Sequence, residues 1–361
     1  MVRLGDICTK GSSNIAQKDL DARNGAYPIY GASGFIKNVD FYHQEKPYVA
    51  VVKDGAGVGR VMLLPAKSSV IGTMQYIIPN DDVNVEYLAY ALEKMDLAKY
   101  YSGATIPHIY FKDYCMEELP VHSADEQRQI ASILNQVSIL IDLRKQQLSK
   151  LDELVKARFV EMFGDVINND RNWPMATMRD VAEIKIGPFG TLLHKEDYIV
   201  GGHALVNPSH IVDGKISVDI GLTVSDEKYE ELSAYHLKID DIVLGRRGEM
   251  GRCAVVREEG LLCGTGSLII RPNEKLKPYF LQAIVSNPTY KKIIEDKAVG
   301  VTMMNLNVPI VESLRVPMLP IELQNDFISF MEHTDKSKLE IQKSLEKLEM
   351  LKKALMQKYF G

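Results

Sequence analysis

Two glycine-rich stretches hold side chains suited to bind a phosphate or a nucleobase. They are VKDGAGVGR at residues 52–60 and LGRRGEMGR at residues 244–252. Arginine and lysine donate hydrogen bonds to phosphate oxygens and to the edge of guanine, while asparagine and glutamine suit adenine. The candidate cations in the two stretches are Lys53, Arg60, Arg246, Arg247 and Arg252.

Other polar side chains lie in neighbouring loop-like segments that contain few aliphatic residues. Each of them could touch a nucleic acid, but each could also be an ordinary solvated surface group. Thr105 and Thr302, with His108 and Asn305, recur as polar residues before a strand, where capping a turn is an equal alternative. The further candidates are Tyr30, Ser33 and Lys37 in the first half, and His194, Lys195, Asn207, Ser209 and His210 in the second.

The alternating glycines Gly55, Gly57 and Gly59 raise the possibility of a nucleotide-binding loop. A phosphate-binding loop needs a Lys-Ser/Thr pair after its last glycine. That pair is absent from both stretches, and only the final Gly-Arg keeps its register between them. We therefore expect a tight turn between two strands, with glycines at positive φ, and no bound cofactor.

The chain contains an internal repeat. GRVMLLPAKSSVIGT (59–73) and GRCAVVREEGLLCGT (251–265) share a Gly-Arg pair, eleven intervening residues and a Gly-Thr pair. Further along, Gln127 pairs with Gln324, and Arg60 pairs with Arg252, which favours a shared phosphate contact or framework role for the two arginines. The framework positions agree while the loops differ, so any ligands of the two halves should differ as well.

Each half is predicted to be a β-rich globular region followed by a long helix. One helix over 85–101 closes the first region, and another over 278–294 closes the second. The residues from 125 to 163 then contain no proline or glycine and place apolar side chains at heptad spacing, a pattern that recurs after Pro320. The polar interruptions of the second pattern are Thr334, Lys338 and Lys352.

Such arms cannot bury their apolar stripes alone. A helix of about 39 residues is roughly 58 Å long. An antiparallel pair of arms would bury both stripes and leave one globular region at each end; the alternative is that each arm folds back on its own domain. The expected fold is α+β, with two mixed domains joined by an antiparallel coiled coil. The expected boundaries are 1–124, 125–164, 165–321 and 322–361.

Composition limits the function classes. The chain has 361 residues, 46% of them hydrophobic, and a formal net charge of -5. No segment is basic, so binding to nucleic acid would need local clusters or a partner that neutralises phosphate. The four cysteines and eight histidines form no metal-ligand pattern, and no apolar stretch is long enough to span a membrane. We expect a soluble cytoplasmic protein without a metal.

Five motifs, in this order, resemble the specificity (S) subunits of type I restriction-modification systems over essentially the whole chain. They are YPIYGASGFIKNVDFY (27–42), the LP…EQRQI entry to the first arm (119–130), the MFGD exit (162–165), GPFGTLLHKEDY (187–198) and DIVLGRRGEMGR (241–252). The second arm departs from the pattern, because Leu323 stands where the first arm has Glu126.

The resemblance implies a non-catalytic subunit with two target-recognition domains. Each domain would bind one half of a bipartite double-stranded DNA target, and the paired helices would hold the domains apart. It also implies two methyltransferase (M) subunits, which bind S-adenosylmethionine and flip adenine, and motor-nuclease restriction (R) subunits.

Two other readings of the sequence remain. A solitary DNA methyltransferase is suggested only by NPTY (287–290), in which Thr289 replaces the second proline of the usual loop. A purely structural coiled-coil scaffold gives no reason for the loops of the two halves to diverge.

Overall fold

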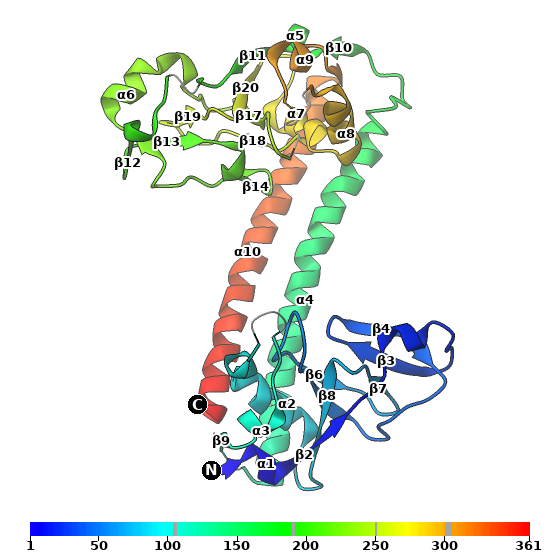
Figure 1. Cartoon of the computed structure of the whole chain (residues 1–361). Helices are drawn as coiled ribbons and strands as arrows, with labels where there is room; N and C mark the ends of the chain where they lie inside the picture. Colours follow the sequence, from blue (N-terminus) through cyan, green and yellow to red (C-terminus); the bar gives the residue numbers. More distant parts are fainter. Residues whose placement is uncertain (104–106, 121, 190–191, 250, 300–304) are drawn as a thin grey trace. The chain divides into compact units, whose positions relative to one another are not determined.

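The computed structural model describes residues 1–103, 107–120, 122–189, 192–249, 251–299 and 305–361. The chain forms two compact units, one made of Met1–Leu148 with Glu340–Gly361 and the other of Ser149–Leu339 (Figure 1). The two long helices, α4 (Ala124–Phe163) and α10 (Ile321–Phe360), contribute residues to both units. None of the helices within the described ranges is long and apolar enough to cross a membrane.

A four-stranded antiparallel sheet is the centre of the first unit. Its order is β2 (Cys8–Ser12), β8 (Met74–Pro79), β5 (Tyr48–Val52) and β6 (Val61–Leu64). The central strand β5 is buried along its whole length, as expected for a strand covered on both faces. Alternate β5 side chains face two different clusters, one packed against helix α2 (Val85–Lys94) and the other toward β7.

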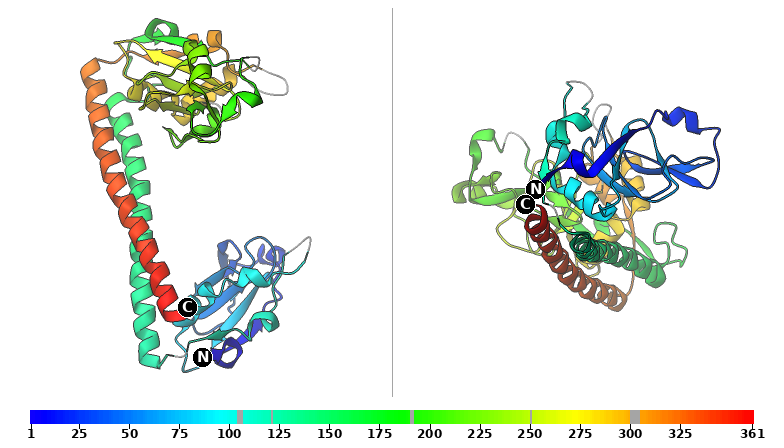
Figure 2. Two further views of the ribbon diagram at one scale, coloured as in Figure 1. Left: turned by 90° about the vertical axis from the view of Figure 1, so that its left-hand side faces the viewer. Right: turned by 90° about the horizontal axis from the view of Figure 1, so that it is seen from below.

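The remaining elements of the first unit frame this sheet. Strand β3 (Tyr27–Gly31) pairs antiparallel with β4 (Gly34–Val39) and parallel with β7 (Ser69–Val70), while β1 (Val2–Arg3) pairs with β9 (Glu118–Leu119). The short helices are α1 (Leu4–Ile7), α3 (Phe111–Tyr114), and the 3-10 turns Gln17–Leu20 and Leu97–Tyr100. Both ends of the chain lie in this unit (Figure 2).

The second unit repeats the same plan. Its main sheet has the order β11 (Ala182–Ile186), β20 (Ser267–Pro272), β17 (Ile242–Gly245) and β18 (Cys253–Val255). The other matching elements are the parallel pair β13 (His203–Val206) with β19 (Leu262–Cys263), the pair β10 (Met175–Thr177) with β21 (Arg315–Pro317), and helix α7 (Pro278–Val285). The predicted internal repeat is therefore confirmed at the level of strand pairing.

The second unit also carries insertions. The strands among them are β12 (Tyr198–Ile199), β14 (Ile211–Val212), β15 (Lys215–Ile216) and β16 (Thr223–Val224). Of the helices, α5 (Met178–Val181) and α9 (Val308–Glu312) occupy the places of α1 and α3, and the others are α6 (Asp226–Glu231), α8 (Pro288–Lys297), and the 3-10 turns Lys195–Asp197, Pro208–His210 and Ser233–Tyr235.

The two predicted closing helices are each shorter than expected. Helix α2 ends at Lys94 because Asp96 adopts a left-handed conformation with φ 49°, and a 3-10 turn follows. In the second unit, α7 stops at Val285 and α8 begins at Pro288, with the Asn287 side chain capping α8. The prediction of one continuous helix was wrong in both halves.

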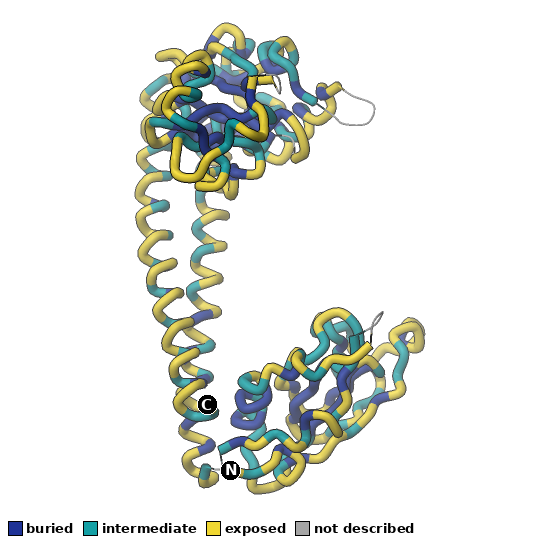
Figure 3. The backbone as a smooth tube through the Cα atoms, turned by 60° about the vertical axis from the view of Figure 1, so that its left-hand side comes forward, coloured by how far each residue is buried: buried dark blue, intermediate teal, exposed yellow. Residues whose placement is uncertain are grey.

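The long helices pair with each other inside each unit. In the first unit, Val137 and Ile141 of α4 pack against Leu345 of α10, so the start of one helix lies beside the end of the other. In the second unit, Phe159 and Phe163 of α4 pack against Phe327 near the start of α10. The pairing is therefore antiparallel within each unit. Figure 3 shows that buried backbone is concentrated in the globular parts, whereas exposed residues recur along both long helices.

The two ends of α4 also pack on globular residues, each within its own unit. Ile130 and Leu134 join the core cluster of the first unit. Phe163 contacts Phe280 of α7, with ring centroids 5.0 Å apart in an edge-to-face arrangement. Each unit is thus a globular region fixed to a two-helix segment by apolar side chains.

Candidate nucleic-acid interface

Arg60 joins two loops at one end of the main sheet in the first unit. Its Nη1 donates a hydrogen bond to the carbonyl oxygen of Ala32 at 2.8 Å, and Ala32 lies in the turn between β3 and β4. Ser33 is exposed in the same turn. Tyr30, at the end of β3, packs edge-to-face against Phe35, with ring centroids 6.0 Å apart. The arginine therefore fixes the turn that presents these side chains.

The turn between β5 and β6 has a backbone conformation that requires glycine. Gly55, Gly57 and Gly59 all have positive φ, at 86°, 91° and 86°. A Cβ on Gly59 would lie 2.5 Å from the backbone nitrogen of Ala98, so only glycine fits there. The predicted turn is confirmed. Lys53 begins it, and the Lys53 ammonium lies 3.5 Å from the Asp54 carboxylate.

Arg252 makes the equivalent link in the second unit. Its Nη1 donates to the carbonyl oxygen of Pro208 at 3.3 Å, in the loop that follows β13. It also pairs with Glu249, and this hydrogen bond lowers the pKa of the Glu249 carboxyl. The repeated arginines thus hold corresponding loops through backbone carbonyls.

The loop after β13 is held close to the end of β19. A Cβ on Gly264 would lie 2.1 Å from Oδ1 of Asn207, and a Cβ on Gly266 would lie 3.0 Å from Cδ of Pro208. These two glycines therefore allow Asn207 and Pro208 to pack directly on the backbone. Ser209, the next residue, is exposed.

Arg246 and Arg247 are neighbours with different environments. The Arg246 side chain is 5% exposed, and its Nε has no hydrogen-bond partner among the described residues. Burial, and then the adjacent charge of Arg247, lower the pKa of the Arg246 guanidinium. The backbone of Arg246 is fixed by donation of its N–H to Gly266 O at 3.0 Å. Arg247 is exposed, so its guanidinium is accessible from solvent.

The other candidates lie elsewhere. The ammonium of Lys37 donates to the carbonyl oxygen of Leu20 at 3.0 Å, and buried His210 lies with Nδ1 2.7 Å from the carbonyl oxygen of Leu205. His194 and Lys195 are exposed at the 3-10 turn before β12, where the Asp197 carboxylate accepts from the His194 N–H at 2.6 Å.

Thr105 and Thr302 lie outside the described residues. His108 exchanges backbone hydrogen bonds with Ser102, and Asn305 does so with Val299.

Two groups of candidates are therefore brought together, one in each unit. Both groups lie where the strands of the repeated sheets enter their turns. The first group is Tyr30, Ser33, Lys53 and Arg60, and the second is Asn207, Ser209, Arg246, Arg247 and Arg252. Their polar and cationic side chains can donate to phosphate oxygens or base edges.

Sequence reasoning missed one feature of the first group and one of the framework, at the end of β17 opposite the second group. Phe35, at the start of β4, is 59% exposed beside Ser33 and could contact a base or sugar by its apolar face. The buried Asp241 carboxylate accepts two hydrogen bonds from Arg271, both at 2.7 Å, and so fixes the start of β17. The Gly-Thr-Gly sequence at 264–266 was a signal that could have predicted the close backbone contacts of the second group.

These features define a class of protein: two copies of one sheet-and-helix plan, each with a polar loop cluster, joined to antiparallel long helices. The family model of the type I restriction modification DNA specificity domain matches residues 1–153 and again residues 170–352. The chain belongs to this family.

Known proteins resemble the chain over nearly its full length. It is 22% identical to the type I restriction enzyme MjaVIII specificity subunit of Methanocaldococcus jannaschii, over 99% of this chain and 90% of that protein. The crystal structure of a type I restriction-modification S subunit from M. genitalium matches with a TM-score of 0.65 and 17% identity, covering 100% of this chain and 95% of that one.

A second solved structure, from a study of complex assembly and conformational transition of the type I R-M system, matches with a TM-score of 0.57 and 13% identity. It covers 99% of this chain and 96% of that one. The two structural matches agree with the expected α+β fold. The matches as a whole assign the chain to the specificity subunits, whose part in these systems is recognition, and not to the catalytic ones.

Proposed function

We propose that the chain is the DNA-recognition subunit of a type I restriction-modification complex and that its two domains recognise different halves of a bipartite double-stranded target. The observation that carries this proposal is the match of the specificity-domain model to both halves of the chain. Residues 1–124 and 165–321 are the proposed recognition domains, and residues 125–164 and 322–361 are the helices that separate them.

The differences between the two loop clusters support unequal half-sites. The first unit offers Ser33 with an exposed aromatic ring, whereas the second offers Ser209 and Arg247. Serine is tolerant of base identity, while arginine suits guanine. Two clusters of different chemistry on one repeated framework are what a non-palindromic target requires.

Within each cluster we assign different roles. Exposed Ser33, Ser209 and Arg247 are proposed to contact DNA, together with Tyr30 and Lys53. Exposed His194 and Lys195 are proposed backbone contacts on a separate surface of the second domain.

The remaining candidate side chains of the two domains already have contacts within the protein, and we propose that they position the loops. Arg60 and Arg252 hold the loops, and Asn207 and Arg246 are wedged beside them. Lys37 and His210 already bond to backbone carbonyls and are proposed to act only through the shape of their loops.

The proposed partners are two methyltransferase subunits and, in restriction, motor-nuclease subunits. The methyltransferase subunits would supply adenosylmethionine binding and catalysis. They would also supply phosphate contacts, since this chain carries a net charge of -5 and cannot depend on long-range attraction to DNA. The paired helices are the proposed docking surface and spacer for these subunits.

The test is to sequence methylated adenines in cells that express the methyltransferase subunit with and without this chain. We expect one bipartite motif, with two unlike half-sites and a fixed spacer, to be methylated only when the chain is present. Replacing residues 1–124 with the corresponding domain of another family member should change one half-site and leave the other. Methylation that does not depend on the chain, or a swap that changes both half-sites, would refute the proposal. A scaffold without DNA recognition would give the first of these results.

A further inference from the structure

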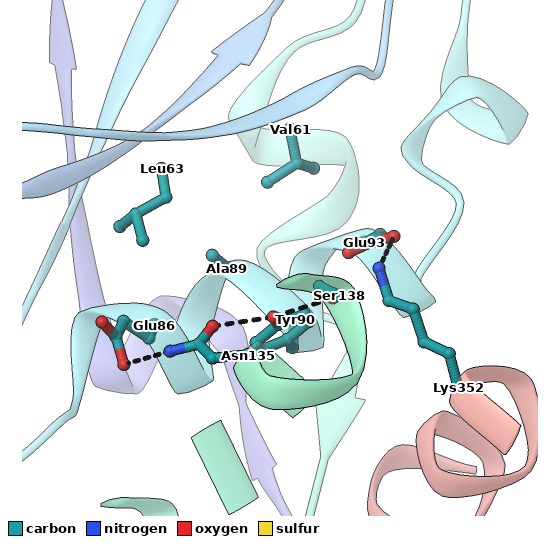
Figure 4. Close-up of a pocket in the computed structure, with 9 residues that line it drawn as sticks. All are labelled: Val61, Leu63, Glu86, Ala89, Tyr90, Glu93, Asn135, Ser138 and Lys352. Atoms are coloured by element: carbon teal, nitrogen blue, oxygen red, sulfur yellow. Dashed lines mark hydrogen bonds and ion pairs between the residues drawn. The ribbon is translucent and has the colours of Figure 1, made fainter. Parts of the chain in front are cut away.

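A groove on the first unit lies outside the loop cluster proposed to bind DNA. It is bounded by strand β6, helix α2 and the two long helices (Figure 4). Its volume is about 190 Å³, and its lining combines apolar side chains with carboxylates. The lining residues are Val61, Leu63, Glu86, Ala89, Tyr90, Glu93, Asn135, Ser138 and Lys352.

The polar side of the groove is an ordered network. Asn135 donates from Nδ2 to Glu86 at 2.8 Å and accepts from the Tyr90 hydroxyl at 2.8 Å. Lys352 lies 3.1 Å from Glu93, and its ammonium is 5.4 Å from the centre of the Tyr90 ring. Figure 4 shows these side chains lined up along α2 on one side of the groove. Glu86 therefore has a hydrogen-bond donor but shares no ion pair within the described network.

The apolar side of the groove is open to solvent. Leu63, on the edge strand β6, is 44% exposed. Counted from the Gly-Arg pairs of the repeat, Leu63 corresponds to Val255 on β18, which is only 4% exposed. The same position on the same framework is thus covered in one unit and uncovered in the other.

In the second unit, the hairpin of β14 and β15 lies at this edge of the sheet. Strand β15 lies beside β18, and the carbonyl oxygen of Gly214, at the hairpin tip, accepts a hydrogen bond from Gln282 Nε2 at 2.6 Å. Counted from the helix N-caps Asn84 and Lys277, Gln282 corresponds to Ala89, which lines the groove of the first unit. A hairpin therefore occupies the region that is a groove in the first unit.

The second unit also supplies a cation at this place. The guanidinium carbon of Arg257 lies 5.2 Å from the centre of the Tyr279 ring, and its Nη2 is 3.9 Å from the Asp335 carboxylate. By the same alignment Tyr279 corresponds to Glu86, and by the pairing of Gln127 with Gln324 Asp335 corresponds to Ser138; Glu86 and Ser138 both line the groove. The second unit thus combines a hairpin at the edge of the sheet with one positive charge.

We infer that the groove binds a hairpin or extended segment of the methyltransferase subunit, which places an apolar side chain on Leu63 and a lysine or arginine at Glu86. The inference rests on the proposed function and adds a specific docking site on one domain only. Charge complementarity decides against DNA as the occupant, because Glu93 is paired with Lys352 and the remaining carboxylate, that of Glu86, would repel phosphate. The covered groove of the second unit supplies the template for the bound segment.

The experiment measures the affinity of the full chain for its methyltransferase subunit by titration calorimetry, in parallel with thermal unfolding of the chain alone. The variants are Leu63→Asp, Glu86→Lys and the milder Glu86→Gln. The matched controls are Ile220→Asp and Glu274→Lys, whose parent residues are exposed in the second unit. We expect Leu63→Asp and Glu86→Lys to weaken binding about tenfold or more, and Glu86→Gln to weaken it less, with the controls unchanged.

Unfolding temperatures equal to the wild type would show that the loss of binding is not a loss of folding. The inference is overturned if folded Leu63→Asp and Glu86→Lys bind the methyltransferase subunit as tightly as the wild type. It is also overturned if the wild-type chain self-associates and Leu63→Asp abolishes that, since the occupant would then be a second copy. Failure of the proposed function looks different: the wild-type chain itself would not bind the methyltransferase subunit or direct methylation.

Discussion

Arg60 and Arg252 each donate to a backbone carbonyl of the loop opposite, at Ala32 and Pro208. A side chain engaged in this way contributes to the position of its loop more than to a direct contact with a base. Arg247 is exposed, and its guanidinium has no hydrogen bond or ion pair with any residue in the described part of the chain, so its donors are available to a ligand. Substitution of exposed Arg247 can therefore be compared with substitution of buried His210.

Arg247→Ala and His210→Ala should separate binding from stability. Arg247→Ala should leave the unfolding temperature unchanged and weaken binding of target DNA by the assembled complex, by about 1–3 kcal/mol if it contacts guanine. His210→Ala should instead lower the free energy of unfolding by about 1–3 kcal/mol, because the carbonyl oxygen of Leu205 loses its partner. Thermal unfolding and fluorescence anisotropy measure the two effects. A destabilised Arg247→Ala variant with unchanged DNA affinity would reverse the assignment.

Residue types and loop positions predicted the candidate set, but not which members would be accessible. Lys37 bonds to Leu20 and His210 bonds to Leu205, and both partners are backbone oxygens. Every residue has a backbone carbonyl, so the residue type does not show whether a side chain already has a hydrogen-bond partner of this kind. The positive φ of Gly55, Gly57 and Gly59 was predictable because glycine is the residue that adopts it without strain.

At the scale of elements, a pair of buried glutamines ties each long helix to its globular region. Oε1 of Gln127 accepts from the Asn84 N–H at 2.9 Å, and Oε1 of Gln324 accepts from the Lys277 N–H at 2.8 Å. Asn84 and Lys277 are the N-caps of α2 and α7. The repeat had paired the two glutamines, and the structure supplies the reason: the same joint is built twice.

Gln324→Leu should destabilise the second unit. The replacement keeps the volume but leaves the Lys277 N–H and the Leu319 carbonyl without this partner, at a cost of about 2–3 kcal/mol. Gln342→Leu, on an exposed position of the same helix, is the control and should change the free energy of unfolding by less than about 0.5 kcal/mol. Urea denaturation followed by circular dichroism measures both. Equal effects of the two variants would show that the joint contributes nothing.

Helix boundaries were predictable where proline and glycine mark them. The long helices run from Ala124 to Phe163 and from Ile321 to Phe360, directly before Gly164 and Gly361. The break after α2 was not predictable, because the residues on both sides of it have helical periodicity, and tertiary packing favours the left-handed Asp96 over a continuous helix. The break after α7 does carry a sequence signal, since Asn287 and Pro288 are a typical N-cap and first helical residue.

At the scale of the whole molecule, the proposed spacer depends on the register between the two long helices. A four-residue insertion into α4 alone, between Leu148 and Ser149, should shift the heptad pattern on one helix and disrupt pairing or assembly. Matching four-residue insertions in both helices should restore pairing and lengthen the spacer by roughly 6 Å, or about two base pairs.

Sequencing of methylated adenines in cells that carry each insertion variant measures the spacer directly. A doubly inserted chain that assembles and methylates the original motif with its original spacing would exclude the helices as the spacer. The single insertion serves as the control for the register, because it adds the same length to only one helix.

The last residues of the chain belong to the core of the first unit. Met356 is buried in that core, and Phe360 packs on Tyr87, with ring centroids 4.9 Å apart. Translation therefore makes most of the first domain well before the α10 residues that complete its core. A nascent chain must keep the Tyr87 face of α2 without its partner until α10 has been made, so a truncation that removes Met356 and Phe360 should destabilise the first domain, although its sheet is left intact.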